Sequence, residues 1–329
     1  MDIQSDLPSN YKLCERFAEY MRQRFCFLAF SGPKSPQPAP LFNIPVDHTI
    51  AMHQMVAKLA EAYQNRSIEF RRLAEDLGHK ESGAAVDREA AFLVKHPTGI
   101  TPHEGFPPVL DKPTIILGEG DTIVLWYLPG ALANNTQKQM LSSLESLPDA
   151  LQKSIVGRNW RTNPDYFQPE SLSGCLEFAP AIHQLGHSAW TDIPSISMAL
   201  KTKSGLAWAS KMSYPSTILS AALSIMHPPM YNARLRGMET LSAWAAENDE
   251  LMGDALADWS MVYTNISLIA NWGTPFHRDP HSRSNWYDIL VSVGEYKNYY
   301  LDILTLGVKL EYSPGTAIAF SGPSPSWSQ

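Results

Sequence analysis

The sequence predicts an α+β fold in which helices dominate the first part of the chain and strands the last part. Residues 56–77 and 235–252 place apolar side chains at the three- and four-residue spacing of an amphipathic helix. Later stretches alternate apolar with other side chains, as a half-buried strand does, over residues 262–270, 287–293, 308–312 and 316–321. We therefore expect a β core with helices packed on it.

Length and composition are those of a globular protein. With 329 residues and 44% hydrophobic content, the chain can form one large domain with an extension, or two domains. It has no apolar run of membrane-spanning length and no signal peptide at Met1, so we expect a nuclear or cytoplasmic protein. A net charge of -7 restricts any DNA contact to a local patch. The three cysteines have no metal-site spacing and predict buried free thiols.

The N-terminal third is expected to be helical. Residues 11–28 predict a short helix, and the Pro-rich stretch that follows predicts an extended linker, so residues 1–40 are interpreted as an arm. Residues 41–110 are interpreted as a helical extension that contains the 56–77 helix.

The middle of the chain begins with a predicted β-hairpin at residues 113–129, where Gly118-Glu119-Gly120 forms the turn rather than a dinucleotide loop. Two helices follow, at 136–147 and 148–156, because Pro148 suits the first turn of a new helix. Residues 157–230 show no clean period and predict long loops over the β core.

The most informative motif is His277-Arg278-Asp279, which follows a predicted strand and a Gly-Thr-Pro turn. In an extended segment, residues two apart project to the same face, so the imidazole and the carboxylate would share one centre. They would supply two of the three ligands of a 2-His-1-carboxylate iron site. The alternative is a structural hydrogen bond between His277 and Asp279.

The sequence segment from Asn271 to Asp279, together with residues 285–290 and 312–322, resembles the fungal TET/J-binding-protein-like oxygenases. These are Fe(II)/2-oxoglutarate dioxygenases that oxidise methylated bases in DNA. The resemblance covers about residues 110–322 and implies a double-stranded β-helix core of the cupin type, flanked by helices. We assign residues 111–322 to this domain, which would be incomplete, and residues 323–329 to an unrelated tail.

The resemblance also implies roles for single residues. His277 and Asp279 correspond to the first two iron ligands and are the expected catalytic pair. Ser282 falls where related enzymes contact the flipped base, and His281 is placed with it on the substrate side; as a third ligand His281 is disfavoured, because that ligand should come from another strand. The implied cofactors are Fe(II) and 2-oxoglutarate, and the implied partner is DNA containing 5-methylcytosine or N6-methyladenine.

Two departures from the family pattern concern cosubstrate binding. The distal His and the Arg that grips 2-oxoglutarate are expected after Gly322, where the sequence ends in a short tail. Trp272 stands where an Arg near the cosubstrate is common. These departures predict impaired catalysis. The alternative is an inert paralogue or fragment that acts as a DNA- or protein-binding module.

Three further patterns are weaker. His183 and His187 have helical zinc spacing, but Gln184 replaces the required Glu. His79-Lys80-Glu81 follows a predicted helix end and is read as solvated charge. A third stretch contains several basic residues with few acidic ones between them: Lys201, Lys203, Lys211, Arg234 and Arg236. We interpret it as ordinary solvated surface, and the alternative is a contact with the DNA backbone.

Overall fold

The computed structural model describes most of the chain, and the chain divides into two compact units. The described residues are 9–31, 37–65, 68–69, 109–157, 160–168, 171–182, 194–273, 286–303, 306, 308–321 and 327–328. Unit 1 comprises Met1–Gln23, Pro40–His48 and Lys138–Trp272, and unit 2 comprises Arg24–Ala39, Thr49–Gln137 and Gly273–Gln329. Among the helices that the structure describes, none combines the length and apolar character needed to cross a bilayer.

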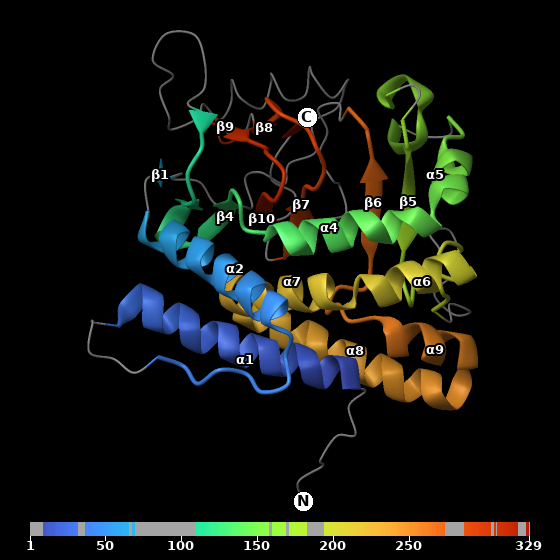
Figure 1. The fold of residues 1–329 in the computed structure, drawn as a ribbon, viewed down its shortest axis with the longest axis horizontal. Helices are drawn as coiled ribbons and strands as arrows, with labels where there is room; N and C mark the ends of the chain where they lie inside the picture. The colour runs from blue at the N-terminus through green and yellow to red at the C-terminus, as the bar shows by residue number, and fades with distance from the viewer. Residues whose placement is uncertain are drawn as a thin grey trace, which may run out of the picture. The chain divides into compact units, whose positions relative to one another are not determined.

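Unit 1 is mainly helical and contains one small antiparallel sheet (Figure 1). Its helices are the first part of α1 (Ser9–Phe30), most of α4 (Asn134–Ser143), α5 (Pro148–Ser154), α6 (Lys203–Lys211), α7 (Ser213–Met226), α8 (Pro228–Asn248) and α9 (Glu250–Asp258). Its strands are β5 (Gly174–Phe178) and β6 (Ile266–Ala270). The predicted break at Pro148 is confirmed, since this proline opens α5.

Helix α7 is buried on nearly every side, and this is why its sequence lacks an amphipathic period. Its hydroxyls bond to carbonyls of the preceding turn: Thr217 donates to Ser213 O at 2.8 Å and Ser220 to Ser216 O at 2.8 Å. Such internal bonds allow polar side chains to be buried within a helix. The prediction of long loops over residues 157–230 was therefore wrong for α6, α7 and the start of α8.

Helix α1 packs into the core of unit 1 through side chains such as Tyr11, Cys14 and Phe17, all 0% exposed. It extends past both ends of the predicted helix at 11–28. Burial raises the pKa of the Cys14 thiol to about 12. The prediction of buried thiols is confirmed for Cys14 and Cys175, but Cys26 is exposed.

The predicted helix at 235–252 is two helices. Asp249 has extended backbone angles and its carboxylate accepts a hydrogen bond from Met252 N at 3.0 Å, which caps α9. At the start of α8, His227 Nδ1 accepts from Met230 N at 3.2 Å in the same way. An Asp inside a periodic stretch was thus a helix start.

Unit 2 is built on two sheets, which we name sheet A and sheet B. Sheet A has the strand order β1-β3-β4-β10-β7, with β1 (Ile68–Glu69), β3 (Thr114–Leu117), β4 (Ile123–Leu128), β10 (Ala317–Ser321) and β7 (Tyr287–Val291). Sheet B has the order β11-β8-β9-β2, with β11 (Trp327–Ser328), β8 (Tyr300–Ile303), β9 (Val308–Glu311) and β2 (Val109–Leu110).

The hydrophobic core of unit 2 joins the two sheets. Side chains of sheet A, including Ile318 and Leu125, pack in one cluster with Leu301, Ile303 and Leu310 of sheet B, and all five are 0% exposed. The Tyr127 hydroxyl of sheet A donates to Glu311 O of sheet B at 2.7 Å. Burial on this scale, at about 25 cal/mol per Å² of apolar surface, makes the interface between the sheets a main source of stability in unit 2.

Helix α2 (Val46–Gln64) lies mostly in unit 2, and its Tyr63 stacks on Trp126 of β4 with ring centroids 6.5 Å apart. The predicted helix at 56–77 was placed too late: α2 begins ten residues earlier, where buried Met52 and Met55 alternate with His53 and Gln54. It also ends at Gln64, and residues 70–77 lie outside the described part of the chain.

The hairpin predicted at 113–129 is confirmed, because β3 and β4 pair antiparallel across a turn in which Gly120 has φ +65°. The strands predicted at 287–293 and 316–321 are β7 and β10, which pair antiparallel with Ala317 opposite Val291. The predicted strand at 308–312 is β9. Strand β6 covers only the second half of the predicted strand at 262–270, and β8 was not predicted.

The four C-terminal strands β7 to β10 pair in a nested order. The inner pair β8 and β9 forms an antiparallel hairpin in sheet B, while the outer pair β7 and β10 is antiparallel in sheet A. In sequence, the β8–β9 hairpin thus lies between the two strands of the β7–β10 pair, and the two pairs belong to different sheets.

In unit 1, strand β5 packs tightly on α5. Gly174 has φ +149°, and a Cβ at this position would lie 2.2 Å from Leu151 O. The Cys175 amide donates to Ser154 Oγ at 2.8 Å, which fixes the strand on the helix. Only glycine fits this approach without moving one backbone against the other.

We predict that Gly174→Ala destabilises unit 1 more than Gly157→Ala. Gly157 also has a positive φ, +66°, but the nearest atom to an added Cβ is 3.9 Å away. Its substitution therefore measures the cost of the backbone conformation without a steric clash. We expect about 1 kcal/mol for Gly157→Ala and about 1–3 kcal/mol more for Gly174→Ala, measured by urea denaturation. Equal losses for the two variants would contradict the close packing of β5 on α5.

Candidate functional site

The segment that contains His277 and Asp279 follows β6, and β6 is held in register by β5. The five residues of β6 pair antiparallel with those of β5, from Gly174 opposite Ala270 to Phe178 opposite Ile266. A polar cluster on the strand surface supports this register. The Glu177 carboxylate accepts hydrogen bonds at 2.8 Å from Asn265 Nδ2 and Ser267 Oγ, with the Arg161 guanidinium at 3.5 Å.

Strand β6 ends at Asn271, which adopts the left-handed conformation with φ +50°. Its side-chain amide donates to Leu172 O at 2.9 Å, and its carbonyl accepts from Gln168 N at 3.0 Å. Asparagine tolerates this backbone conformation better than most residues. Asn271 therefore both terminates the strand and fixes the direction in which the chain leaves it.

Trp272 is an apolar anchor at the same point. It is 8% exposed, forms a β-bridge with Phe167 and belongs to a cluster with Phe167 and Cys175. Burial, reinforced by Glu177, raises the pKa of the Cys175 thiol to about 11. The sequence placed Trp272 where related oxygenases carry an Arg. Here its indole packs in unit 1 against Phe167 and Cys175.

The structure does not describe the predicted site residues themselves. His277, Asp279, His281 and Ser282 lie within residues 274–285, which are outside the described part of the chain. His79, His183 and His187 lie in other stretches that are also outside it. Among the described residues, no group of three His, Cys, Asp or Glu side chains could hold a metal ion. The ligand pair His277 and Asp279 therefore stays a prediction.

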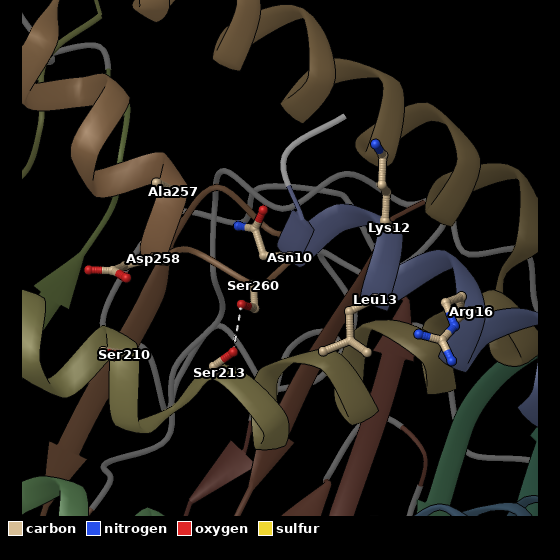
Figure 2. A pocket seen from close by; sticks show the side chains of 9 residues that line it. All are labelled: Asn10, Lys12, Leu13, Arg16, Ser210, Ser213, Ala257, Asp258 and Ser260. Carbon is tan, nitrogen blue, oxygen red and sulfur yellow. Dashed lines mark hydrogen bonds between the residues drawn. The ribbon is translucent and has the colours of Figure 1, made fainter. Parts of the chain in front are cut away.

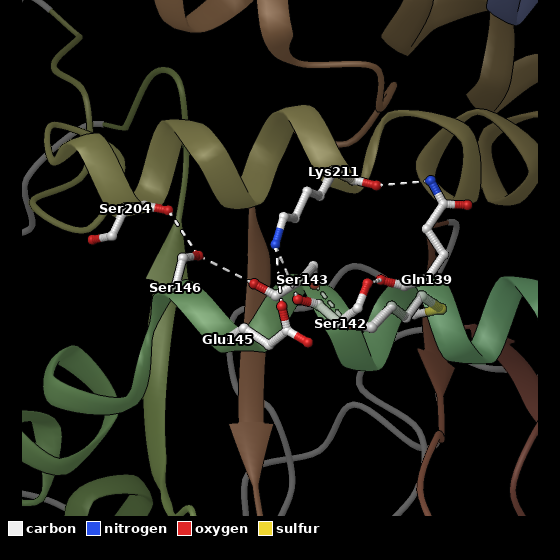
Figure 3. Close-up of polar contacts among 8 residues, drawn as sticks. Gln139, Ser142, Ser143, Glu145, Ser146, Ser204 and Lys211 are labelled. Carbon is white, nitrogen blue, oxygen red and sulfur yellow. Dashed lines mark hydrogen bonds and ion pairs between the residues drawn. The ribbon is translucent and has the colours of Figure 1, made fainter.

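The loosely basic stretch does not form a free cationic patch at Lys211. Its ammonium donates to Ser142 O at 3.2 Å and lies 3.7 Å from the Glu145 carboxylate, while its carbonyl accepts from Gln139 Nε2 at 2.9 Å (Figure 3). These bonds join α6 to α4 within unit 1. Lys211 therefore has a structural role, which favours the first of the two interpretations of this stretch.

The other four basic residues of that stretch lie in two places: Lys201 and Lys203 are at the start of α6, and Arg234 and Arg236 are on α8. Lys201 and Lys203 are exposed at the start of α6, whereas Arg234 of α8 has its guanidinium carbon 4.9 Å from the centre of the Tyr263 ring. Arg236 is exposed on α8. The quadrupole of the ring attracts the cation and holds the Arg234 guanidinium against Tyr263.

Sequence reasoning missed Asn271 and Glu177, the two residues that fix the end of β6. An Asn directly after an apolar strand is a turn signal and could have identified the first. Nothing in the local sequence marks Glu177, because its partners Asn265 and Ser267 are 88 and 90 residues away.

Comparison with known proteins finds distant matches among solved structures. No family model matches the sequence, and no curated protein matches it. The fold is similar to a solved structure of NgTET1 in complex with 5mC DNA, with a TM-score of 0.40 and 14% sequence identity, over 71% of this chain and 80% of that chain.

We predict that Asn271→Ala costs about 1–3 kcal/mol of stability, because it loses the hydrogen bond to Leu172 O and places an alanine in the left-handed region. Asn271→Gly keeps the backbone conformation and should recover about half of that loss. Thermal unfolding of both variants checks this. The assignment of Asn271 as a strand terminator fails if alanine is tolerated as well as glycine.

Proposed function

We propose that this chain is an Fe(II)/2-oxoglutarate oxygenase-like domain that acts on methylated bases in DNA. The observation that carries the proposal is the nested pairing of β7 with β10 and β8 with β9, directly after the His277-Arg278-Asp279 motif. Jelly rolls arrange eight strands in two sheets, and nested antiparallel pairs that belong to different sheets support this reading. The apolar core that sheets A and B share supports a two-layered β fold.

The motif fits the donor chemistry of an Fe(II) site as far as its residues go. Neutral imidazole from His277 and a carboxylate from Asp279 would hold two positions of a facial triad, and the third must come from another strand. Bound Fe(II) with 2-oxoglutarate and O2 supplies the oxidising power that a methyl C–H bond requires. The role of His277 and Asp279 is to bind and orient that ion.

The proposed substrate is 5-methylcytosine or N6-methyladenine in DNA. A base inside a duplex cannot reach a buried centre, so it must be extruded at a cost of a few kcal/mol. Ser282 and His281, which closely follow the ligand pair, are proposed to contact the extruded base. The chain's net charge of -7 means that the phosphate contacts must come from a local cluster of Lys and Arg.

A second candidate function is a DNA- or protein-binding module without catalysis. The observation in its favour is that Trp272, at a position where the oxygenases that this sequence resembles commonly carry an Arg, is buried against Phe167 and Cys175. A jelly-roll domain that retains its sheets but binds no iron would keep its surface and lose its chemistry.

We predict that the purified full chain, loaded anaerobically with Fe(II) and 2-oxoglutarate, retains stoichiometric iron through gel filtration. His277→Ala and Asp279→Ala should each lower iron affinity by about tenfold or more, since each removes one protein ligand. Metal analysis of the protein fractions measures this without requiring turnover. His79→Ala is the matched control, because it removes a histidine that is also followed two residues later by an acid, and it should leave iron content unchanged.

Turnover is tested in parallel with methylated duplex DNA, by mass spectrometry of oxidised bases and succinate. Oxidised bases that depend on His277 support the oxygenase. A different outcome would favour the binding module over the oxygenase: neither the wild type nor the His79→Ala control retains iron, and His277→Ala binds DNA or protein as well as the wild type.

A further inference from the structure

A polar cavity of about 350 Å³ lies within unit 1. Three segments form it: the start of α1, the junction of α6 and α7, and the end of α9 (Figure 2). Its lining residues are Asn10, Lys12, Leu13, Arg16, Ser210, Ser213, Ala257, Asp258 and Ser260. The volume is within the range of small-molecule sites.

Hydrogen bonds between distant parts of the chain hold these walls in place. The Asn10 side-chain amide donates to Leu256 O at 3.0 Å and to Trp259 O at 2.6 Å, tying α1 to the end of α9. The Ser213 and Ser260 hydroxyls are 3.0 Å apart and form the middle of the cavity wall (Figure 2). A site whose walls are fixed before binding loses less entropy when a ligand enters.

The cavity has opposite charges on opposite sides (Figure 2). Lys12 and Arg16 are one helical turn apart on α1, and Arg16 is oriented by donating to Phe42 O at 3.0 Å. Asp258 is the last residue of α9, where the terminal carbonyls of the helix add partial negative charge. Among the described residues, neither Lys12 nor Asp258 has a hydrogen-bond or ion-pair partner.

We propose that this cavity binds a small zwitterion, a free amino acid with a polar side chain. A simple anion would be attracted by Lys12 and Arg16 but repelled by Asp258, and a simple cation would meet the reverse. A molecule with an ammonium group and a carboxylate satisfies both sides. The hydroxyls of Ser210, Ser213 and Ser260 can bond a polar side chain between them.

The probe is L-glutamine, titrated into the full chain by calorimetry and by saturation-transfer NMR. The matched probes are 4-carbamoylbutanoate, which lacks the ammonium group, and 4-aminobutanamide, which lacks the carboxylate. We expect L-glutamine to bind at least about tenfold more tightly than either, because each analogue loses one charge-assisted contact. Equal affinity for L-glutamine and either analogue, or no binding of L-glutamine, overturns the proposal.

Variants locate the site. Asp258→Asn and Lys12→Gln should each weaken L-glutamine binding by about threefold to tenfold. Asp149→Asn and Lys153→Gln remove exposed charges of the same kinds on α5 and should have no effect. Ser210→Trp fills the cavity from an exposed position, so it tests the site without changing the buried core, and unaltered binding by this variant also overturns the proposal.

Discussion

The pairing of β10 with two other strands is the constraint on which unit 2 depends. Strand β10 bonds to β4 on one side and to β7 on the other, so it joins the hairpin of residues 114–128 to strands more than 150 residues later. Ala317, Ile318, Ala319 and Phe320 are all at most 5% exposed. A strand that is buried on both faces is central in its sheet, and its burial fixes the register of both neighbours.

The register of β10 also decides how sheet B closes over the core. Ile318 packs with Leu301 and Leu310, which belong to the hairpin of β8 and β9. A slip of one residue would place Ala319 in that core and turn Ile318 to the opposite face. The turn before β10 supports the register, since Gly315 adopts φ +85° and its amide donates to Ser292 O at 2.8 Å. Close packing and turn chemistry thus require the same pairing.

Alternation and turn residues predicted most of the strands, but periodicity missed a helix that is buried all round and one short strand. Strands β7 and β9, the hairpin of β3 and β4, and the break at Pro148 followed from alternation and from turn residues. Helix α7 did not, because it is buried all round and its serines and threonines bond to its own carbonyls. Strand β8 is only four residues long, so it gave too short a pattern.

The candidate site shows the same division between local and long-range information. The sequence predicts that His277 and Asp279 share a face, and that prediction needs only their spacing. Anchoring of the chain on either side depends on partners distant in sequence. In unit 1, Asn271 bonds to Leu172, 99 residues away, and in unit 2 the Tyr287 hydroxyl donates to Ile123 O. No local pattern encodes either contact.

The two proposed functions differ in what they require of this chain. Asn271 and Trp272 are fixed within unit 1, and Tyr287 is fixed within unit 2. An oxygenase would additionally require His277 and Asp279 to bind Fe(II), whereas a binding module would not. Metal binding by this pair therefore distinguishes the two proposals, since one fold can serve either role.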